Sequence, residues 1–323
     1  MITIGTPLLW ICFGAFVVAA LIVDFVVLKK EGAHRVGVRE AAIWSAIWVA
    51  LSLAFAAVLW WWMTRTVGRE VADTRIVEFL TGYLIEKSLA IDNVFVFLTI
   101  FTYFALPGEY QKRALMIGII AAIVLRAVMI FAGAALIERF DWILYVFGAF
   151  LVLTGIKMWT SVGKESSLDD NPALRMLRRV IKVAPQYDGE RMTTTQNGVR
   201  MATPLLLVVA LIGVTDVIFA VDSIPAIFAI TTDPFIVLTS NIFAVLGLRA
   251  MFFLLADMAD RFHLLPYGLA VILLFVGAKM LAAGVFHIPP LVSLGVILGI
   301  LATTIALSLR VKAEDHAPVA RKQ

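Results

Sequence analysis

Residues 203–231 read TPLLLVVALIGVTDVIFAVDSIPAIFAIT, and Asp216 and Asp222 are the only charged residues in that stretch. An α-helix needs about 20 apolar residues to cross the hydrocarbon core of a bilayer. The stretch therefore predicts a transmembrane helix that places two carboxylates inside the membrane. Each such charge costs about 2.5–3.5 kcal/mol to insert, so it needs a partner or a function.

Apolar segments of the same kind recur along the whole chain. Hydrophobic residues make up 62% of its 323 residues and charged residues 15%, whereas soluble domains average roughly 45–50% and 25%. This excess predicts a surface that faces lipid, in an all-α polytopic membrane protein whose residues 1–323 form a single transmembrane domain. The nine expected spans are 7–28, 39–63, 77–104, 112–137, 140–160, 203–231, 234–257, 263–283 and 288–310.

The distribution of Lys and Arg predicts the orientation of these spans. With the N-terminus outside, the inner segments carry 19 of these residues and the outer loops carry four, namely Arg65, Arg69, Arg75 and Arg139. Loops rich in Lys and Arg stay on the cytoplasmic side. We therefore expect the N-terminus outside and the C-terminus in the cytoplasm.

The longest loop, residues 161–202, is cytoplasmic in this topology. Asn171 and Pro172 are favourable residues at the start of a short helix. The apolar face of that helix would consist of Leu174, Leu177 and Ile181. Because its other faces are basic, we expect an amphipathic helix on the anionic inner leaflet. Asn197-Gly198 predicts a β-hairpin, and a disordered linker is the alternative for the loop.

Two parts of the chain resemble each other. Residues 138–158 read ERFDWILYVFGAFLVLTGIKM, and residues 260–280 read DRFHLLPYGLAVILLFVGAKM. Upstream, LRAVMIF at 125–131 matches LRAMFF at 248–253. Chance similarity between Leu-rich helices would explain the apolar matches but not the charged ones. The pattern predicts an internal repeat.

Each copy of the repeat holds three spans, about 77–160 in the first and about 203–283 in the second. An odd number of spans makes the second copy enter the membrane from the opposite side. The flanking helices 7–28, 39–63 and 288–310 lie outside the repeat. Inverted three-helix repeats with a site near the bilayer midplane are typical of transporters.

The charged residues within the spans form a set of four acids and three bases. The acids are Glu86, Asp92, Asp216 and Asp222, and the bases are Lys87, Arg126 and Arg249. One interpretation is a structural network in which each arginine neutralises one acid. The other is an ion site, because the set leaves one net negative charge that a cation or proton would balance. One straight helix cannot direct both of its acids at a single ion, so either the helix unwinds or the acids have different partners.

Pro225 and the residue types around it narrow the kind of ion. Pro225 cannot donate to the carbonyl of Val221, which frees that oxygen beside Asp222 for a cation, although a tolerated kink is an equal alternative. Carboxylate, amide, hydroxyl and carbonyl oxygens suit Mg²⁺, Ca²⁺ and Mn²⁺ alike, whereas Zn²⁺ and copper prefer imidazole and thiolate.

The motifs EKSLAIDNVFVF, DVIFAVDSIPAIFAIT, TSNIFAVLGLRAM and YGLAVILLFVGAKM together resemble the TerC family of bacterial membrane proteins, and the opening GTPLLW is similar to its Alx-like members. The resemblance covers nearly the whole chain. It implies a multi-pass protein of the bacterial plasma (inner) membrane that acts in manganese export and homeostasis. Some members carry a tellurite-resistance name, and Alx-like members a redox-modulator name. The family's motif residues correspond here to Glu86, Asp92, Asn93, Asp216, Asp222 and Ser223.

The leading hypothesis from the sequence is a divalent metal ion transporter, most simply a manganese exporter. Its candidate ligands are Asp92 and Asp222 first, then Glu86, Asp216, Asn93, Ser223 and the carbonyl of Val221. Its candidate charge-pairing residues are Arg126, Arg249 and Lys87. We expect Mn²⁺ as substrate rather than a permanently bound cofactor, no enzymatic activity, contact with membrane lipids, no nucleic acid, and room for a homo-oligomer or a membrane-protein partner.

Two alternatives come from other functional classes. A non-transporting scaffold would metalate or assemble secreted proteins, using the loop 161–202. A redox- or stress-responsive membrane modulator is the other, and it is weakened because Cys12 is the only cysteine in the chain.

Overall fold

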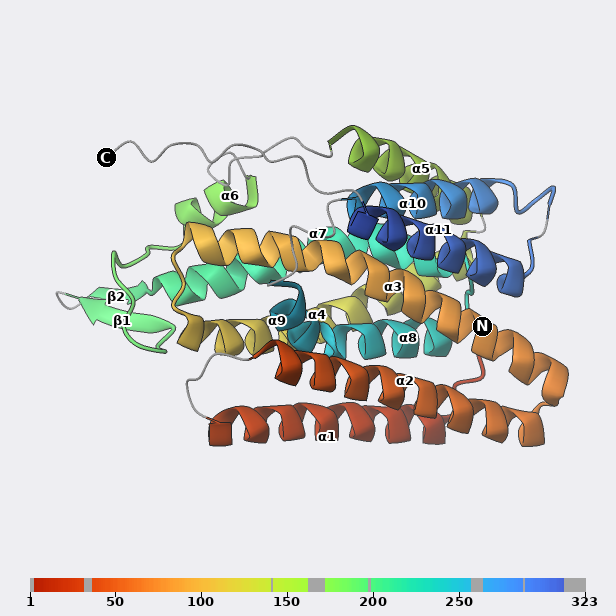
Figure 1. Ribbon diagram of the computed structural model, residues 1–323, viewed down its shortest axis with the longest axis horizontal. Coiled ribbons are helices and arrows are strands. Elements are labelled where there is room, and N and C mark those ends of the chain that lie inside the picture. The colour runs from red at the N-terminus through yellow and green to blue at the C-terminus, as the bar shows by residue number, and fades with distance from the viewer. Residues whose placement is uncertain are drawn as a thin grey trace.

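The computed structural model describes residues 3–31, 37–140, 142–161, 172–196, 199–256, 264–286 and 288–310. Most of these residues are helical, and the long helices lie side by side along the long axis of the molecule (Figure 1). The helices are α1 (Pro7–Glu31), α2 (Val38–Thr66), α3 (Arg69–Tyr103), α4 (Gly108–Arg139), α5 (Ile143–Ser161), α6 (Pro172–Val180), α7 (Pro204–Phe228), α8 (Pro234–Leu246), α9 (Leu248–Ala256), α10 (Leu265–Leu281) and α11 (Pro290–Arg310). The strands are β1 (Thr193–Gln196) and β2 (Val199–Ala202).

Among the described residues, six helices are long and apolar enough to cross a membrane, and a seventh span results if α8 and α9 count as one. The six are α1, α2, α4, α5, α7 and α11. The chain is thus an all-α polytopic membrane protein with one small hairpin. The structure does not confirm the nine predicted spans, because α3 and α10 do not qualify. Glu86, Lys87 and Asp92 interrupt the apolar sequence of α3, and α10 has only 17 residues.

α8 and α9 form a broken helix. They meet at Gly247 and are bent by 42° relative to each other. A Cβ atom at Gly247 would lie 2.5 Å from the Lys87 ammonium nitrogen and 3.2 Å from Trp48 Cβ. The bend therefore lies where α2 and α3 pack closely against the chain.

The long helices pair across the two halves of the sequence. α3 packs mainly against α8, α4 against α7, and α5 against α10. α3 and α7 run in opposite directions. Arg75 near the start of α3 donates to Thr231 after the end of α7 at 3.3 Å, and Tyr187, ahead of α7, donates to the carbonyl of Phe104, just after α3, at 2.8 Å. Figure 1 shows the same directions, since α3 ends and α7 begins on the side of the hairpin.

α5 and α10 also run in opposite directions, and glycines let their backbones come close. A Cβ atom at Gly277 would lie 2.8 Å from the carbonyl oxygen of Gly148. One turn or more away, a Cβ atom at Gly155 would lie 3.0 Å from the carbonyl oxygen of Ala270. No side chain fits between the helices at these two points.

Asp233 ties the N-terminal segment to the start of α8. Its carboxylate caps α8 by accepting from the amide of Phe235 at 2.9 Å, as expected for an acid before Pro234. The same carboxylate accepts from the hydroxyl of Thr3 and from the amide of Ile4, each at 2.8 Å. Asp233 is buried, so four groups of the chain are fixed at one point.

The loop between α5 and α7 contains the predicted helix and hairpin. α6 begins at Pro172, and β1 pairs with β2 in a register that joins Gln196 to Val199, as a two-residue turn requires. Asn171 and Asn197-Gly198 lie outside the described residues. The expectation that the apolar face of α6 inserts into lipid is wrong for Leu174, which is 1% exposed, because this face of α6 packs against α7.

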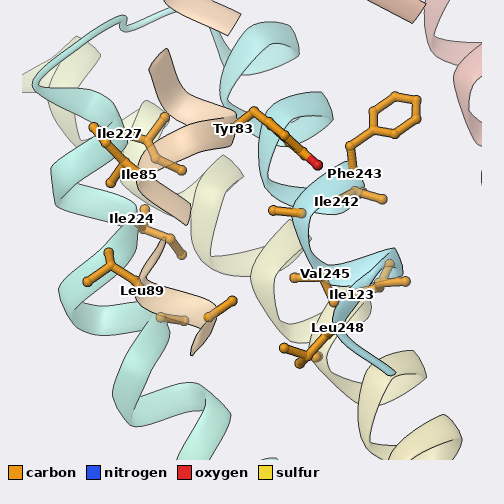
Figure 2. Close-up of a cluster of buried hydrophobic side chains, with 14 of the residues drawn as sticks. Tyr83, Ile85, Leu89, Ile123, Ile224, Ile227, Ile242, Phe243, Val245 and Leu248 are labelled. Carbon is orange, nitrogen blue, oxygen red and sulfur yellow. The ribbon is translucent and has the colours of Figure 1, made fainter. Parts of the chain in front are cut away.

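The apolar core of the bundle forms where α3, α4, α7, α8 and α9 meet (Figure 2). Its buried residues include Tyr83, Ile85, Leu89, Ile123, Ile224, Ile227, Ile242, Phe243, Val245 and Leu248. Glu86 lies on α3 directly after Ile85 and is itself fully buried. A carboxylate therefore enters the driest part of the protein.

Candidate functional site

Arg126 of α4 is the centre of a buried cluster of charges. Its guanidinium donates through Nε to Oδ2 of Asp216 at 3.1 Å and through Nη2 to Oδ1 at 2.9 Å, and its Nη1 forms an ion pair with Glu86. Arg126 is 1% exposed and Asp216 2%. Three helices, α3, α4 and α7, thus contribute one charged group each to the same point.

Asn241 of α8 completes the cluster. Its Oδ1 accepts from Nη1 of Arg126 at 3.4 Å, a long hydrogen bond. Its Nδ2 and the Oε2 of Glu86 are buried and have no hydrogen-bond partner among the described residues. Counted in their ionised forms, two carboxylates and one guanidinium would leave one net negative charge. An unsatisfied buried carboxylate oxygen is costly, so this cluster is not fully compensated.

Two glycines bring the helices close enough for these contacts. Gly82 lies one turn before Glu86 on α3, and a Cβ atom there would lie 2.9 Å from the hydroxyl of Ser240 on α8. Gly118 lies on α4, and a Cβ atom there would lie 2.8 Å from Cγ2 of Ile212, one turn before Asp216 on α7. Small residues at such crossings allow close packing of membrane helices.

Asp222 lies apart from this cluster. It is half-buried, and it accepts from the hydroxyl of Thr154 on α5 at 3.3 Å. α7 is helical from Pro204 to Phe228, so it does not unwind between the two acids or at Pro225. Of the two arrangements that the sequence allows, the acids of α7 therefore have different partners.

The other candidate ligands are distributed around the bundle. Asn93 and Ser223 are buried, and the hydroxyl of Ser223 has no partner among the described residues. Val221 is 42% exposed. Asp92 belongs to α3, but its side chain lies outside the described part of the structure.

Arg249 and Lys87 contact groups that the sequence analysis did not include. Arg249 of α9 forms an ion pair with Asp24 of α1. Lys87 donates to the backbone carbonyl of Ala244 at 3.3 Å, in the last turn of α8. That carbonyl precedes the break at Gly247, so the ammonium stabilises the end of a helix whose carbonyls lack partners.

Within the described ranges, no three residues of the types His, Cys, Asp and Glu lie together as a metal site would require. The predicted ligands whose side chains the structure describes do not surround one point. Two of them, Glu86 and Asp216, do meet, and the group between them is the Arg126 guanidinium.

Asn241, Asp24 and Thr154 are the contacts that sequence reasoning missed. Asn241 lies in the quoted motif TSNIFAVLGLRAM, and its polarity within an apolar helix was a usable signal. Asp24 is the one acid of the first span and offered the same signal. Thr154 gave none, because threonine is common in transmembrane helices that have no site.

Comparison with known proteins places the chain among bacterial membrane proteins. Residues 71–316 match the integral membrane protein TerC family. The chain is 55% identical to the Escherichia coli (strain K12) protein named membrane-bound redox modulator Alx, over 95% of this chain and 96% of that protein. It is 48% identical to a membrane protein of Myxococcus xanthus, over 98% and 96% of the two chains, and 38% identical to one of Rickettsia bellii, over 92% and 97%. No solved structure matches the chain. The chain, a multi-pass membrane protein, belongs to the TerC family of integral membrane proteins.

Proposed function

We propose that this protein is a divalent-cation transporter of the bacterial inner membrane, without enzymatic activity, and that it exports Mn²⁺. The observation that carries the proposal is the buried cluster of Glu86, Arg126 and Asp216, in which two carboxyl groups share one guanidinium in the bundle interior. Intramembrane carboxylates of this kind mark ion pathways. Their oxygens suit Mn²⁺, Mg²⁺ and Ca²⁺, and the family resemblance favours Mn²⁺ among them.

In the arrangement described here, the guanidinium of Arg126 occupies the place that a cation would take. Glu86 and Asp216 together carry two negative charges, which match one divalent ion, whereas the single charge of Arg126 leaves one charge uncompensated. The ion and the guanidinium would therefore exclude each other. Binding of the ion requires Arg126 to withdraw, and its return would expel the ion.

The way the helices pair, together with the opposite directions of α3 and α7, supports an inverted repeat. α3 pairs with α8 as α4 pairs with α7, and α5 pairs with α10, so exchanging the two halves reproduces the same set of contacts. In that repeat Glu86 corresponds to Asp216, and Arg126 corresponds to Arg249. Inverted repeats allow the two halves to exchange conformations during alternating access.

The two corresponding arginines, Arg126 and Arg249, have different surroundings. This difference suggests how their positions would change between the two conformations. Arg126 lies on α4 and contacts the central acids, whereas Arg249 follows the 42° break and contacts Asp24 on α1. We propose that in the opposite conformation Arg249 leaves Asp24 and approaches Glu86 and Asp216, while Arg126 withdraws. Arg126 would then close the site toward one side of the membrane, and Arg249 would close it toward the other.

Asp222 is the proposed second ligand position on the path. It lies six residues, about 9 Å along an ideal helix, beyond Asp216. It is half-buried, its one hydrogen-bond partner among the described residues is the hydroxyl of Thr154, and Lys157 of α5 is its basic neighbour, with which an approaching cation would compete. Asp92 would hold the corresponding place in the first copy.

Purified protein in liposomes that contain a Mn²⁺-sensitive dye tests the proposal. We expect Mn²⁺ entry with the wild type and none with Glu86→Gln or Asp216→Asn. Glu70→Gln is the matched control, because Glu70 is an exposed acid on the same helix as Glu86. Wild-type flux in both variants, or no flux above that of protein-free vesicles, would refute transport through this cluster.

The redox role in the names of the Alx relatives has less support in this chain. Cys12 is the only cysteine, and it is exposed on α1. A single thiol cannot cycle between a dithiol and an intramolecular disulfide.

A further inference from the structure

A groove with a basic rim lies at the end of the bundle where α3 ends and α7 begins. Its rim carries Arg178, Arg179 and Lys182, and its apolar floor includes Phe104, Met201 and Leu207. The groove encloses about 580 Å³, within the roughly 300–1,000 Å³ of small-molecule sites. Basic and apolar surfaces thus face one space.

Two of the basic rim residues, Arg179 and Lys182, have no neutralising partner among the described residues. Arg178 donates to the hydroxyl of Tyr103 at 3.2 Å, and its guanidinium lies 5.9 Å from the centre of that ring. The side chains of Arg179 and Lys182 form no hydrogen bond or ion pair with any described residue, and no acid is among the residues that line the groove. A negatively charged ligand would therefore meet uncompensated cations.

The position of the groove along the helices matches the level of lipid headgroups. Tyr103 is the last residue of α3, and Pro204, which lines the groove, is the first residue of the membrane-spanning α7. A polar headgroup lies just beyond the hydrocarbon core that such a helix spans. Leu207 on the apolar floor belongs to the first turn of α7, so the floor reaches the start of a membrane-spanning helix.

We propose that this groove is a binding site for one anionic phospholipid, with its phosphate on Arg179 and Lys182 and the start of its acyl chains on the floor formed by Phe104, Met201 and Leu207. Basic pockets at the ends of transmembrane helices hold anionic headgroups in this way. The site depends on α6 and on the hairpin, which together build its rim. It is independent of ion transport.

Native mass spectrometry of the detergent-purified, full-length protein tests this site, with phosphatidylglycerol and phosphatidylcholine as probes. We expect phosphatidylglycerol to bind more tightly than phosphatidylcholine. The double variant Arg179→Gln, Lys182→Gln should weaken phosphatidylglycerol binding about 25-fold, because each basic side chain near an anionic surface contributes about fivefold. Arg175→Gln is the matched control, since Arg175 is exposed on α6 but does not line the groove.

Three results would overturn the proposal. Equal weakening by Arg175→Gln would mean a diffuse charge effect without a site. Competition by inorganic phosphate at the lipid's own concentration would mean a site for a soluble anion. Phosphatidylglycerol binding that requires deletion of residues 311–323 would mean that the chain's own C-terminal segment occupies the groove. The melting temperature of each variant, which we expect to be unchanged, shows that the loop remains folded.

Discussion

Arg126 holds Asp216 through two parallel hydrogen bonds, from Nε at 3.1 Å and from Nη2 at 2.9 Å, across the contact between α4 and α7. This two-pronged geometry is the strongest that an arginine and a carboxylate form. The remaining nitrogen of the guanidinium contacts Glu86, so the two halves of the sequence are joined by one side chain. Stability and transport should therefore both depend on Arg126.

Replacing Arg126 with glutamine should strongly destabilise the protein. The change leaves two buried carboxylates without a cation, and breaking a buried pair in this way costs about 3–5 kcal/mol. Thermal unfolding in detergent measures the loss. Arg249→Gln is the control, because its pair with Asp24 is less deeply buried. A smaller loss for Arg126→Gln than for Arg249→Gln would contradict the central role of Arg126.

Asp222→Asn should reduce Mn²⁺ transport while leaving stability nearly unchanged. Asp222 is half-buried, its one hydrogen-bond partner among the described residues is the hydroxyl of Thr154, and it has no close ion pair there, so the folded state loses little, about 1 kcal/mol. Asp216→Asn should reduce both quantities, because it removes one half of a buried ion pair. Dye-based flux and thermal unfolding, measured on the same two preparations, separate the roles. Normal flux in Asp222→Asn would remove this residue from the path.

Gly118→Ala should destabilise the contact between α4 and α7. The added methyl group would lie 2.8 Å from Cγ2 of Ile212, closer than two carbon atoms can approach, so either the Ile212 side chain or the helices must shift. Overpacking of this kind costs about 1–3 kcal/mol. Gly213→Ala on α7 is a matched control, because a Cβ atom there has no neighbour within 4 Å. Equal melting temperatures for the two variants would show that the contact between α4 and α7 accommodates the added methyl group.

Asp233→Ala should release the N-terminal segment and fray the start of α8. The variant loses a helix cap and the hydrogen bonds from Thr3 and Ile4, for which we expect a cost of about 2–3 kcal/mol. Hydrogen exchange should rise at Ile4 and Phe235. Thr3→Ala removes only one of these bonds and should give a smaller change. Unchanged protection at both amides in Asp233→Ala would contradict the contact.

Linking α1 to α9 covalently, one turn away from Asp24 and Arg249, should stop transport. The proposed exchange of arginines requires Arg249 to leave Asp24, so α1 and α9 must separate in each cycle. A variant with Ala20→Cys on α1, Phe253→Cys on α9 and Cys12→Ser keeps both Asp24 and Arg249, and it can be treated with a cleavable bifunctional thiol reagent. Transport should fall on treatment and return on cleavage. A variant that transports equally well when linked would show that α1 and α9 stay together.

Features that depend on local sequence could be predicted from it. The long apolar stretches predict the spanning helices, Pro172 predicts the start of α6, and a two-residue turn between β1 and β2 follows from Asn197-Gly198. Each depends on neighbouring residues only. The count of spans was less certain, because the charges of α3 and the short α10 are compatible with more than one path through a membrane.

The partners of the buried charges could not be read from the sequence. Helical spacing places Glu86 on a face of α3, but it does not tell which helix covers that face. Arg126 therefore could be assigned to an acid in general, and only the packing of α4 against α7 assigns it to Asp216. Asp24 was missed for the same reason, since its partner Arg249 lies in the other half of the chain.

The close contact of α5 with α10 limits how the protein can move. A Cβ atom added at Gly277 would lie only 2.8 Å from the carbonyl oxygen of Gly148, so the two backbones pack too closely for any side chain to separate them. We expect α5 and α10 to move as one rigid body, relative to which the remaining helices tilt. A bulky side chain at Gly148 or Gly277 would push α5 and α10 apart. It should therefore change the rate of the transport cycle although neither position belongs to the proposed ion path.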